Sequence, residues 1–267
     1  MSLVIVRAAG LCTVQDLGRR GHMHEAIPPG GALVRELLVA ANRAVNNRDE
    51  APAVEVLGQL VVRATSDLVV ATDRILPHSL RANEELVIAS EPARCTYLAI
   101  AGGIATPRVL DGHGTLLAAG LGAPLRAGET LAAGQHGGET ATRALTAFSS
   151  SDVIHVIAGP DLDAFAADAL AVLTAQPYRI LPSSDRVGTR LAGTALPRLA
   201  TYREQSRPMV HGAIEVPRDG QPIVLGPEHP TTGGYPIVAV IANAELGRFH
   251  AIRLGGNVRF ALATSSR

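Results

Sequence analysis

Short apolar runs separated by turn-forming residues dominate the sequence, and this pattern constrains the fold most. The runs span residues 3–8, 60–72, 85–90, 95–103, 151–159, 221–226 and 236–243, bounded by Gly, Pro, Asn or Asp. Runs of this length with such boundaries are typical of β-strands. Because few of them alternate with helical segments, a doubly wound α/β sheet is disfavoured and a mainly β chain is predicted.

Two segments predict helices. Residues 32–47 carry apolar side chains at helical spacing and stop at Asn46 and Asn47. Residues 160–177 begin with Pro160 and acidic residues and end at Pro177, which are favoured at the two ends of a helix. The apolar faces of the two helices would consist of Leu33, Leu37, Ala41 and Val45, and of Leu162, Phe165, Leu170 and Leu173.

A weak internal repeat indicates barrel-like β-structure. Residues 80–90, 125–134 and 252–261 share an apolar–Arg pair, a turn and a short apolar strand, a plan typical of meanders in small barrels. The Gly-, Thr-, Ala- and Ser-rich stretch at 135–149 is interpreted as a linker. We therefore expect an N-terminal β-rich subdomain over 1–140 and a C-terminal barrel over 150–267.

Composition narrows the possible partners. The formal net charge is zero, so no electrostatic argument favours nucleic acid or an anionic membrane. No apolar run reaches membrane-spanning length, and the N-terminus does not resemble a signal peptide, so a cytoplasmic location is expected. Cys12 and Cys95 are too few for a disulfide framework or a zinc site and are expected to be buried.

The chain contains no lysine. A Walker A loop, a lysine Schiff base and a kinase-type ATP lysine are therefore excluded, and the chain cannot carry biotinyl-lysine. If the protein takes part in ATP-driven chemistry, we expect the ATP on a partner.

The first candidate motif spans residues 13–32. Gln15 and Asp16 offer an amide and a carboxylate, and Arg19 a guanidinium suited to a carboxylate or bicarbonate-like anion. Gly30 and Gly31 allow the backbone to approach a ligand closely. The alternative is a long loop organised by an Asp–Arg pair. His22 and His24, in the same stretch, lack a third ligand of suitable spacing, so no metal is expected.

The second and third candidate motifs lie in the C-terminal half. In "PSSDRVGTRLAG" (182–193), Ser184 and Asp185 are turn residues beside Arg186, and a loop tied by Asp–Arg bonding is as plausible as a ligand site. In "TTGGYP" (231–236), two glycines could take positive φ and turn successive N–H groups toward a carbonyl or carboxylate. A Gly-Gly hairpin turn is the alternative there.

These motifs together resemble one family. "GLCTVQDLGRRGHMHEAIPPGGA", "LAIAGGIATPRVL", "SSDRVGTRLAG" and "HGAIEVPRDGQPIVLGPEHPTTGGYPIVAVI" occur in this order in the biotin-dependent carboxyltransferase, or allophanate hydrolase subunit 2, family. The resemblance runs from near residue 3 to near residue 261. The family includes the C subunits of 5-oxoprolinase (KipA-like proteins) and the second half of the urea carboxylase carboxyltransferase region.

The resemblance implies a fold of two cyclophilin-like β-barrel subdomains with a few short helices. It also implies ATP-dependent conversion of 5-oxoproline to glutamate, in a complex with A and B subunits, the latter KipI-like. ATP would sit on a partner, and this chain would bind no cofactor. Two alternatives remain: carboxyl transfer to urea from carboxybiotin delivered by a partner, and a non-catalytic KipA-like regulator that binds a homologue of the B subunit.

Carried over by position, the resemblance assigns site residues that we expect to converge on one cleft holding an amide or carboxylate. The expected catalytic residues are Gln15, Asp16, Arg19 and Arg186. The expected substrate-binding residues are Gly30, Gly31, Ser184, Asp185, Gln221, Thr231, Thr232, Gly233, Gly234 and Tyr235. Further motif matches include Gly18, His24, Gly188, Arg190, Gly212 and Glu215. The sequence departs from the family pattern at Leu33, Val34 and His113.

Overall fold

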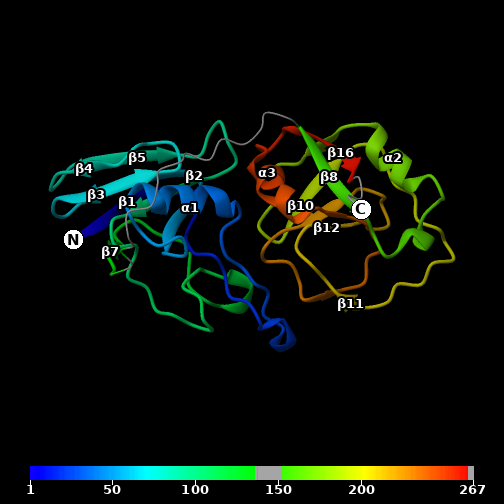
Figure 1. The fold of residues 1–267 in the computed structure, drawn as a ribbon, viewed down its shortest axis with the longest axis horizontal. Helices are drawn as coiled ribbons and strands as arrows, with labels where there is room; N and C mark the ends of the chain where they lie inside the picture. Colours follow the sequence, from blue (N-terminus) through cyan, green and yellow to red (C-terminus); the bar gives the residue numbers. More distant parts are fainter. Residues whose placement is uncertain (136, 138–151, 264–267) are drawn as a thin grey trace. The chain divides into compact units, whose positions relative to one another are not determined.

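The computed structural model describes residues 1–135, 137 and 152–263, which fall into two compact units. Unit 1 comprises Met1–Gly21 and Pro29–Ala147, and unit 2 comprises His22–Pro28 and Phe148–Arg267. Strands dominate both units (Figure 1), which confirms the mainly β fold class. Apart from residues 135 and 137, the predicted linker at 135–149 and the boundaries at 140 and 150 lie outside the described residues.

Unit 1 is built on a seven-stranded sheet with the order β4-β3-β6-β2-β1-β7, in which β5 also pairs with β2. The two longest strands, β1 and β2, pair antiparallel, and Gly10 faces Gly58 in this pair. A Cβ atom at either glycine would lie 2.2 Å from a carbonyl oxygen of the opposite strand, so only glycine fits. The strands are β1 (Ser2–Gln15), β2 (Ala53–Ala64), β3 (Leu68–Thr72), β4 (His78–Leu80), β5 (Glu85–Ala89), β6 (Thr96–Ile100) and β7 (Thr130–Ala132).

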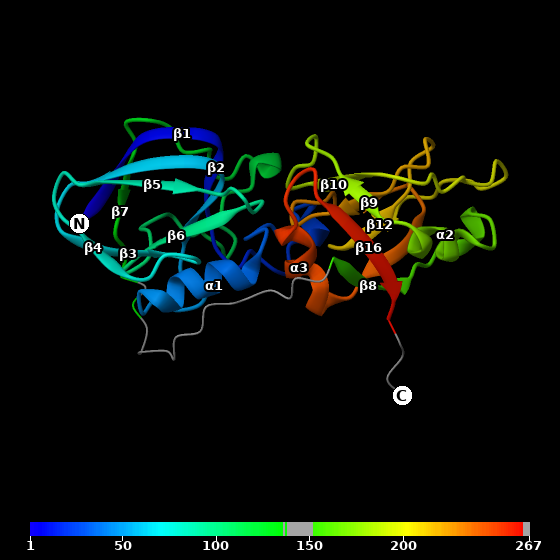
Figure 2. The same ribbon diagram turned by 90° about the horizontal axis from the view of Figure 1, so that it is seen from above.

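The helix predicted over 32–47 is present as α1 (Arg35–Ala44), which contacts β6, β3 and β2 (Figure 2). It buries Leu37, Leu38 and Ala41. Asn46 ends it with a φ of 56°, a conformation that asparagine tolerates better than most residues. The Asn47 side chain then donates to the carbonyl of Ile100 at 2.8 Å, which ties the end of the helix to β6.

Unit 2 contains a closed barrel with the order β10-β13-β12-β15-β8-β16-β9. Each strand contributes inward apolar residues to one core, for example Leu191, Ile214 and Val224. Two short strands, β11 (Arg207–Pro208) and β14 (Thr232–Gly233), form a separate ribbon. The barrel strands are β8 (Val153–Ala158), β9 (Tyr178–Ile180), β10 (Gly188–Ala192), β12 (Ala213–Glu215), β13 (Ile223–Leu225), β15 (Ile237–Ile241) and β16 (Asn257–Leu262).

The prediction of one helix over 160–177 is wrong. The segment forms a 3₁₀ turn at Leu162–Ala164 and a short helix, α2 (Ala169–Ala175). Phe165 between them is extended and bridges Arg198, so its side chain enters the barrel core while Leu162 is 37% exposed. Tertiary pairing thus overrides local helix propensity. A further helix, α3 (Leu246–Ala251), was not predicted.

The three predicted repeats share one turn. In each, the arginine carbonyl accepts a hydrogen bond from the N–H three residues later, at Glu84, Glu129 and Gly256. The residue before that donor has positive φ, at Asn83 (68°), Gly128 (91°) and Gly255 (77°), which is why Asn or Gly stands there. The repeat is therefore a turn preference shared by both units.

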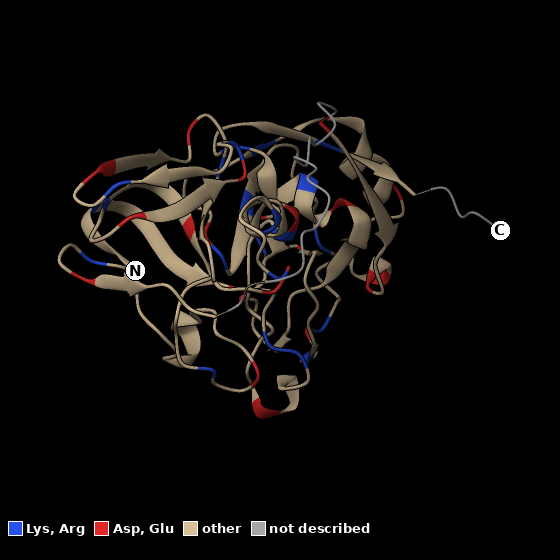
Figure 3. Cartoon of the chain, turned by 60° about the vertical axis from the view of Figure 1, so that its left-hand side comes forward, with Lys and Arg blue, Asp and Glu red and all other residues tan. Residues whose placement is uncertain are grey.

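Other expectations from composition can be compared with the structure. Cys12 and Cys95 are buried and neither forms a disulfide, and burial raises the pKa of the Cys12 thiol to about 11. No helix among the described residues is long and apolar enough to cross a membrane. Acidic and basic residues are interspersed along the described chain (Figure 3).

Candidate functional site

Asp16 holds together the first motif in unit 1. Its carboxylate accepts hydrogen bonds from the backbone N–H of Gly18 at 2.8 Å and of His113 at 2.6 Å. The residue is only 4% exposed, so both contacts are sheltered from water. Asp16 therefore organises the loop through backbone donors, not through the Asp–Arg pair considered from the sequence.

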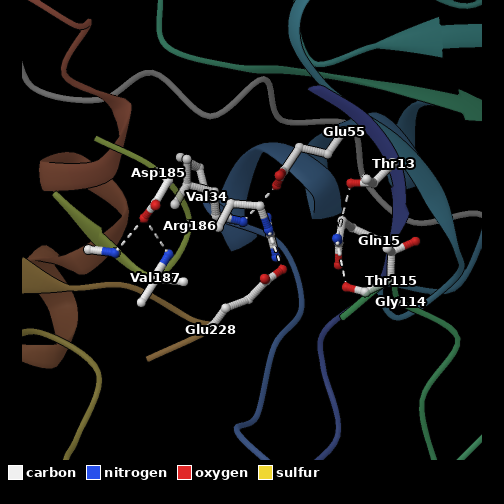
Figure 4. Close-up of polar contacts among 12 residues, drawn as sticks. Thr13, Gln15, Val34, Glu55, Gly114, Thr115, Asp185, Arg186, Val187 and Glu228 are labelled. Atoms are coloured by element: carbon white, nitrogen blue, oxygen red, sulfur yellow. Dashed lines mark hydrogen bonds and ion pairs between the residues drawn. The ribbon is translucent and has the colours of Figure 1, made fainter. Parts of the chain in front are cut away.

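Gln15 and Arg19 also bond to the protein itself. Gln15 Nε2 donates to Thr13 Oγ1 at 3.1 Å and to the Thr115 carbonyl at 3.0 Å (Figure 4). Arg19, 2% exposed, donates to the carbonyls of Val109 and Gly114 at 3.3 and 2.6 Å. These donors are engaged by the fold, which favours positioning roles for the two residues.

Gly30 and Gly31 have φ values of 61° and 84°. A Cβ at Gly31 would lie 2.6 Å from the Gly18 nitrogen, so the close approach expected of this glycine is to the loop of its own motif. The Gly30–Gly31 step thereby closes the first motif on itself.

Two pockets lie beside this motif within unit 1. One of about 490 Å³ is lined by Arg19, Thr106, His113 and Thr115 among others. The other, of about 260 Å³, is lined by Asp16, Arg48, Arg108 and His113 among others. His113, one of the departures from the family pattern, lines both.

The other departures, Leu33 and Val34, are buried at 2% and 0% exposure. Their N–H groups bond to Glu55 Oε2 at 2.7 Å and to the Tyr97 hydroxyl at 3.0 Å. Burial raises the pKa of Tyr97 well above its ordinary value. Sequence reasoning missed Glu55 and Tyr97, because each lies in an ordinary apolar strand pattern.

In unit 2, Arg186 forms a buried ion pair. Its Nε donates to Glu228 Oε1 at 2.6 Å (Figure 4), and the two side chains are 3% and 5% exposed. Glu228 was missed from the sequence, although it lies just before "TTGGYP". A buried carboxylate beside a buried guanidinium is consistent with a role in holding the barrel loops together.

Ser184, Asp185 and Gln221 organise turns in unit 2. Ser184 Oγ accepts the Arg190 N–H at 3.0 Å. Asp185 Oδ1 accepts the N–H groups of Val187 and Gly188, both at 2.9 Å. Gln221 Oε1 accepts the Gly193 N–H at 3.0 Å. Each contact stabilises a turn, as the alternative to a ligand site in the sequence analysis predicts.

The two glycines of "TTGGYP" do not form the predicted positive-φ nest, since neither has positive φ. Gly233 instead packs against Met209: a Cβ there would lie 2.5 Å from Met209 Cε. Met209 belongs to a cluster with Ala213, Leu225 and Ile237. Thr231, Thr232 and Tyr235 have no side-chain hydrogen bond within the described residues, and Tyr235 is 41% exposed.

Glu215 on β12 was matched to the third motif but not predicted as a site residue. Its neighbours Ile214 and Val216 point into the barrel core, so Glu215 points to the outer face. It is 9% exposed, and its carboxyl has no hydrogen bond or ion pair among the described residues. Burial raises the pKa of Glu215 to about 7, against an opposing effect of Arg190.

The predicted site residues thus divide between the units. Gln15, Asp16, Arg19, Gly30 and Gly31 lie in unit 1, and the remaining ones lie in unit 2. Their convergence on one cleft, and their catalytic or binding roles, stay predictions. His22 Nδ1 lies 2.6 Å from Glu25 Oε2, and the described residues include no cluster of three metal-binding side chains.

Comparison with known proteins places this architecture in a family. The model of the carboxyltransferase domain, subdomain A and B, matches residues 25–262, so the chain belongs to that family. The resemblance stated from the sequence is thereby confirmed.

One curated relative is the C subunit of the 5-oxoprolinase of Escherichia coli (strain K12), which is 32% identical over 97% of this chain and 90% of that protein. Its name describes one part of a larger enzyme. Among solved structures, TTHA0988 has a TM-score of 0.85 at 26% identity over 97% of this chain. This chain spans 55% of that one.

The fold also recurs in a much larger enzyme. The crystal structure of the K. lactis urea amidolyase has a TM-score of 0.88 at 22% identity, covering 98% of this chain and 19% of that chain. At this identity the similarity shows a shared fold.

Proposed function

We propose that this chain is the C subunit of an ATP-dependent 5-oxoprolinase, which converts 5-oxoproline to glutamate together with A and B subunits. The observation that carries the proposal is the similarity to the E. coli protein along nearly the full length of both chains. The ordered motifs that the two-unit fold holds in place support it.

ATP is proposed to bind to a partner. The chain has no lysine, so the lysine-dependent phosphate sites cannot be built from it. In this division of labour the chain binds no cofactor of its own and contributes a surface for the amide substrate.

The hydrogen-bond pattern favours the outer face of the unit 2 barrel as that surface. The motif side chains Gln15, Asp16, Arg19 and Ser184 hydrogen-bond to their own loops. Polar side-chain groups without a hydrogen bond among the described residues remain at Arg190 and Glu215 on the barrel, at Thr231, Thr232 and Tyr235 in and beside β14, and at Gln15 Oε1 in unit 1. Groups that bind a ligand must be available to it, and among these residues Arg190 and Glu215 are the two that share the outer face of the barrel.

Two other functions have specific support. The fold shared with urea amidolyase is compatible with carboxyl transfer to urea, in which case carboxybiotin must come from a partner because this chain cannot be biotinylated on lysine. The apolar departures Leu33 and Val34, both buried, are compatible with a non-catalytic protein that binds a KipI-like homologue of the B subunit.

The test is co-expression with homologues of the A and B subunits from the same source, followed by assay of glutamate formed from 5-oxoproline. Release that requires ATP and all three proteins is expected. A stable complex that carboxylates urea with a biotinylated partner would favour the first alternative. A complex that releases glutamate without this chain would favour the second alternative, a non-catalytic binding protein.

A further inference from the structure

The outer face of the unit 2 barrel brings a carboxyl group and a guanidinium group into one row. Strand register places Glu215 of β12 and Arg190 of β10 opposite the same residue, Ile223 of the intervening β13. Residues paired in this way point to the same face of a sheet. The backbones of Glu215 and Arg190 are separated by two strand spacings, about 10 Å. Both side chains extend from the outer face of the barrel.

The surroundings of Glu215 are apolar. Its cross-strand neighbours are Ile223 and Ile237. On β10, Gly188 carries no side chain, and a Cβ there would lie 2.8 Å from Ile223 Cγ2. The Ile223 side chain therefore packs directly over Gly188, and glycine at this position leaves room for it.

The charges near Glu215 are few. Arg190 is the charged side chain that acts on it, and the flanking residues of β13 and β15 are apolar. Arg207, on the β11–β14 ribbon, pairs with Asp161 instead. A carboxyl group in this setting exists in both protonation states near neutral pH, and the protonated form can donate as well as accept.

We propose that Glu215 and Arg190 form the subsite for a cyclic amide that carries a carboxylate: the protonated Glu215 pairs with the lactam, and Arg190 binds the carboxylate. This inference rests on the proposed function and names residues for it. In a lactam the N–H and C=O lie on the same side of the amide bond. A protonated carboxyl group meets both at once, with its O–H donating to the lactam oxygen and its C=O accepting from the lactam N–H.

The Glu215→Gln variant separates the hydrogen bonding of residue 215 from its ionisation. A glutamine side chain offers the same donor and acceptor without ionising. The Glu215→Gln variant should therefore bind the lactam at every pH, whereas the affinity of the parent for the lactam should fall as Glu215 ionises. A leucine at 215 offers neither group.

The experiment is isothermal titration calorimetry of the full chain, and of its assembled complex, with 5-oxoproline. From about pH 6 to about pH 8, parent affinity should fall about tenfold, because only the protonated fraction binds. Glu215→Gln should bind with no such fall. Glu215→Leu should lower the affinity for 5-oxoproline at least tenfold.

Ligand analogues separate the two residues. Arg190→Met should lower the affinity for 5-oxoproline at least tenfold. It should leave the affinity for 2-pyrrolidinone, which lacks the carboxylate, unchanged. N-methyl-5-oxoproline should bind poorly to the parent. The matched control Arg259→Met, an exposed arginine on β16, should change nothing.

Unaltered binding by Glu215→Leu, pH-independent binding by the parent, or no binding by chain or complex would overturn the proposal. The proposed function can fail separately. Binding with the expected dependence but no glutamate release would retain the subsite and reject the hydrolase. Glutamate release that Glu215→Leu leaves unaffected would retain the proposed hydrolase and reject the subsite.

Discussion

At the scale of single residues, the motif side chains divide by what they contact. Asp16, Ser184 and Asp185 bind backbone N–H groups of their own turns. Glu215 is buried too, but its carboxyl group bonds to none of the described residues. A structural role predicts loss of stability on mutation, whereas an available carboxyl group predicts pH dependence.

Asp16→Ala is expected to lower the free energy of unfolding by about 3 kcal/mol, because two buried N–H groups lose an ionised acceptor. Urea denaturation monitored by circular dichroism measures this. Asp163→Ala removes an exposed carboxylate and should change stability by less than about 0.5 kcal/mol. An Asp16 variant as stable as its parent would refute the organising role.

Glu215 should make stability depend on pH in a defined direction. Its folded-state pKa of about 7 lies above the ordinary 4.5, so the folded state binds the proton more tightly, and stability is lost as pH rises through this interval. Glu215→Gln should match the stability of the parent below about pH 4 and exceed it by about 3 kcal/mol above about pH 7. Parallel pH–stability curves for the two proteins would contradict this.

At the scale of elements, turns were predictable and the helical segment at 160–177 was not. The repeated Arg-led turns follow from Asn or Gly at one position, a purely local requirement. Phe165 breaks the predicted helix through its bridge to Arg198, a partner distant in sequence. Local pattern cannot encode such a contact.

The turn at Gly128 gives a test of the local argument. Gly128→Ala should destabilise the protein by about 1–2 kcal/mol, because φ is 91° and the surroundings are open, so only backbone strain acts. Gly137→Ala is the matched control, since that glycine is equally open without positive φ. Thermal unfolding of both variants measures the difference, and equal melting temperatures would argue against strain.

At the scale of the whole molecule, the sequence identified the motifs but not the contacts that each residue makes. Arg19 and Arg186 were predicted to hold substrate from their residue type and from the family resemblance. Their burial, and their bonds to the Gly114 carbonyl and to Glu228, depend on segments far away in the chain. Glu215 was passed over because a glutamate in a short strand carries no local signal of burial.

The proposed role makes this chain a required part of an ATP-dependent 5-oxoprolinase. The measurement to make is glutamate release by the complex, assembled with and without the chain. We expect ATP-dependent release only when the chain is present, and an increase of at least tenfold in KM for 5-oxoproline with Arg190→Met. Release at the same rate without the chain would contradict it.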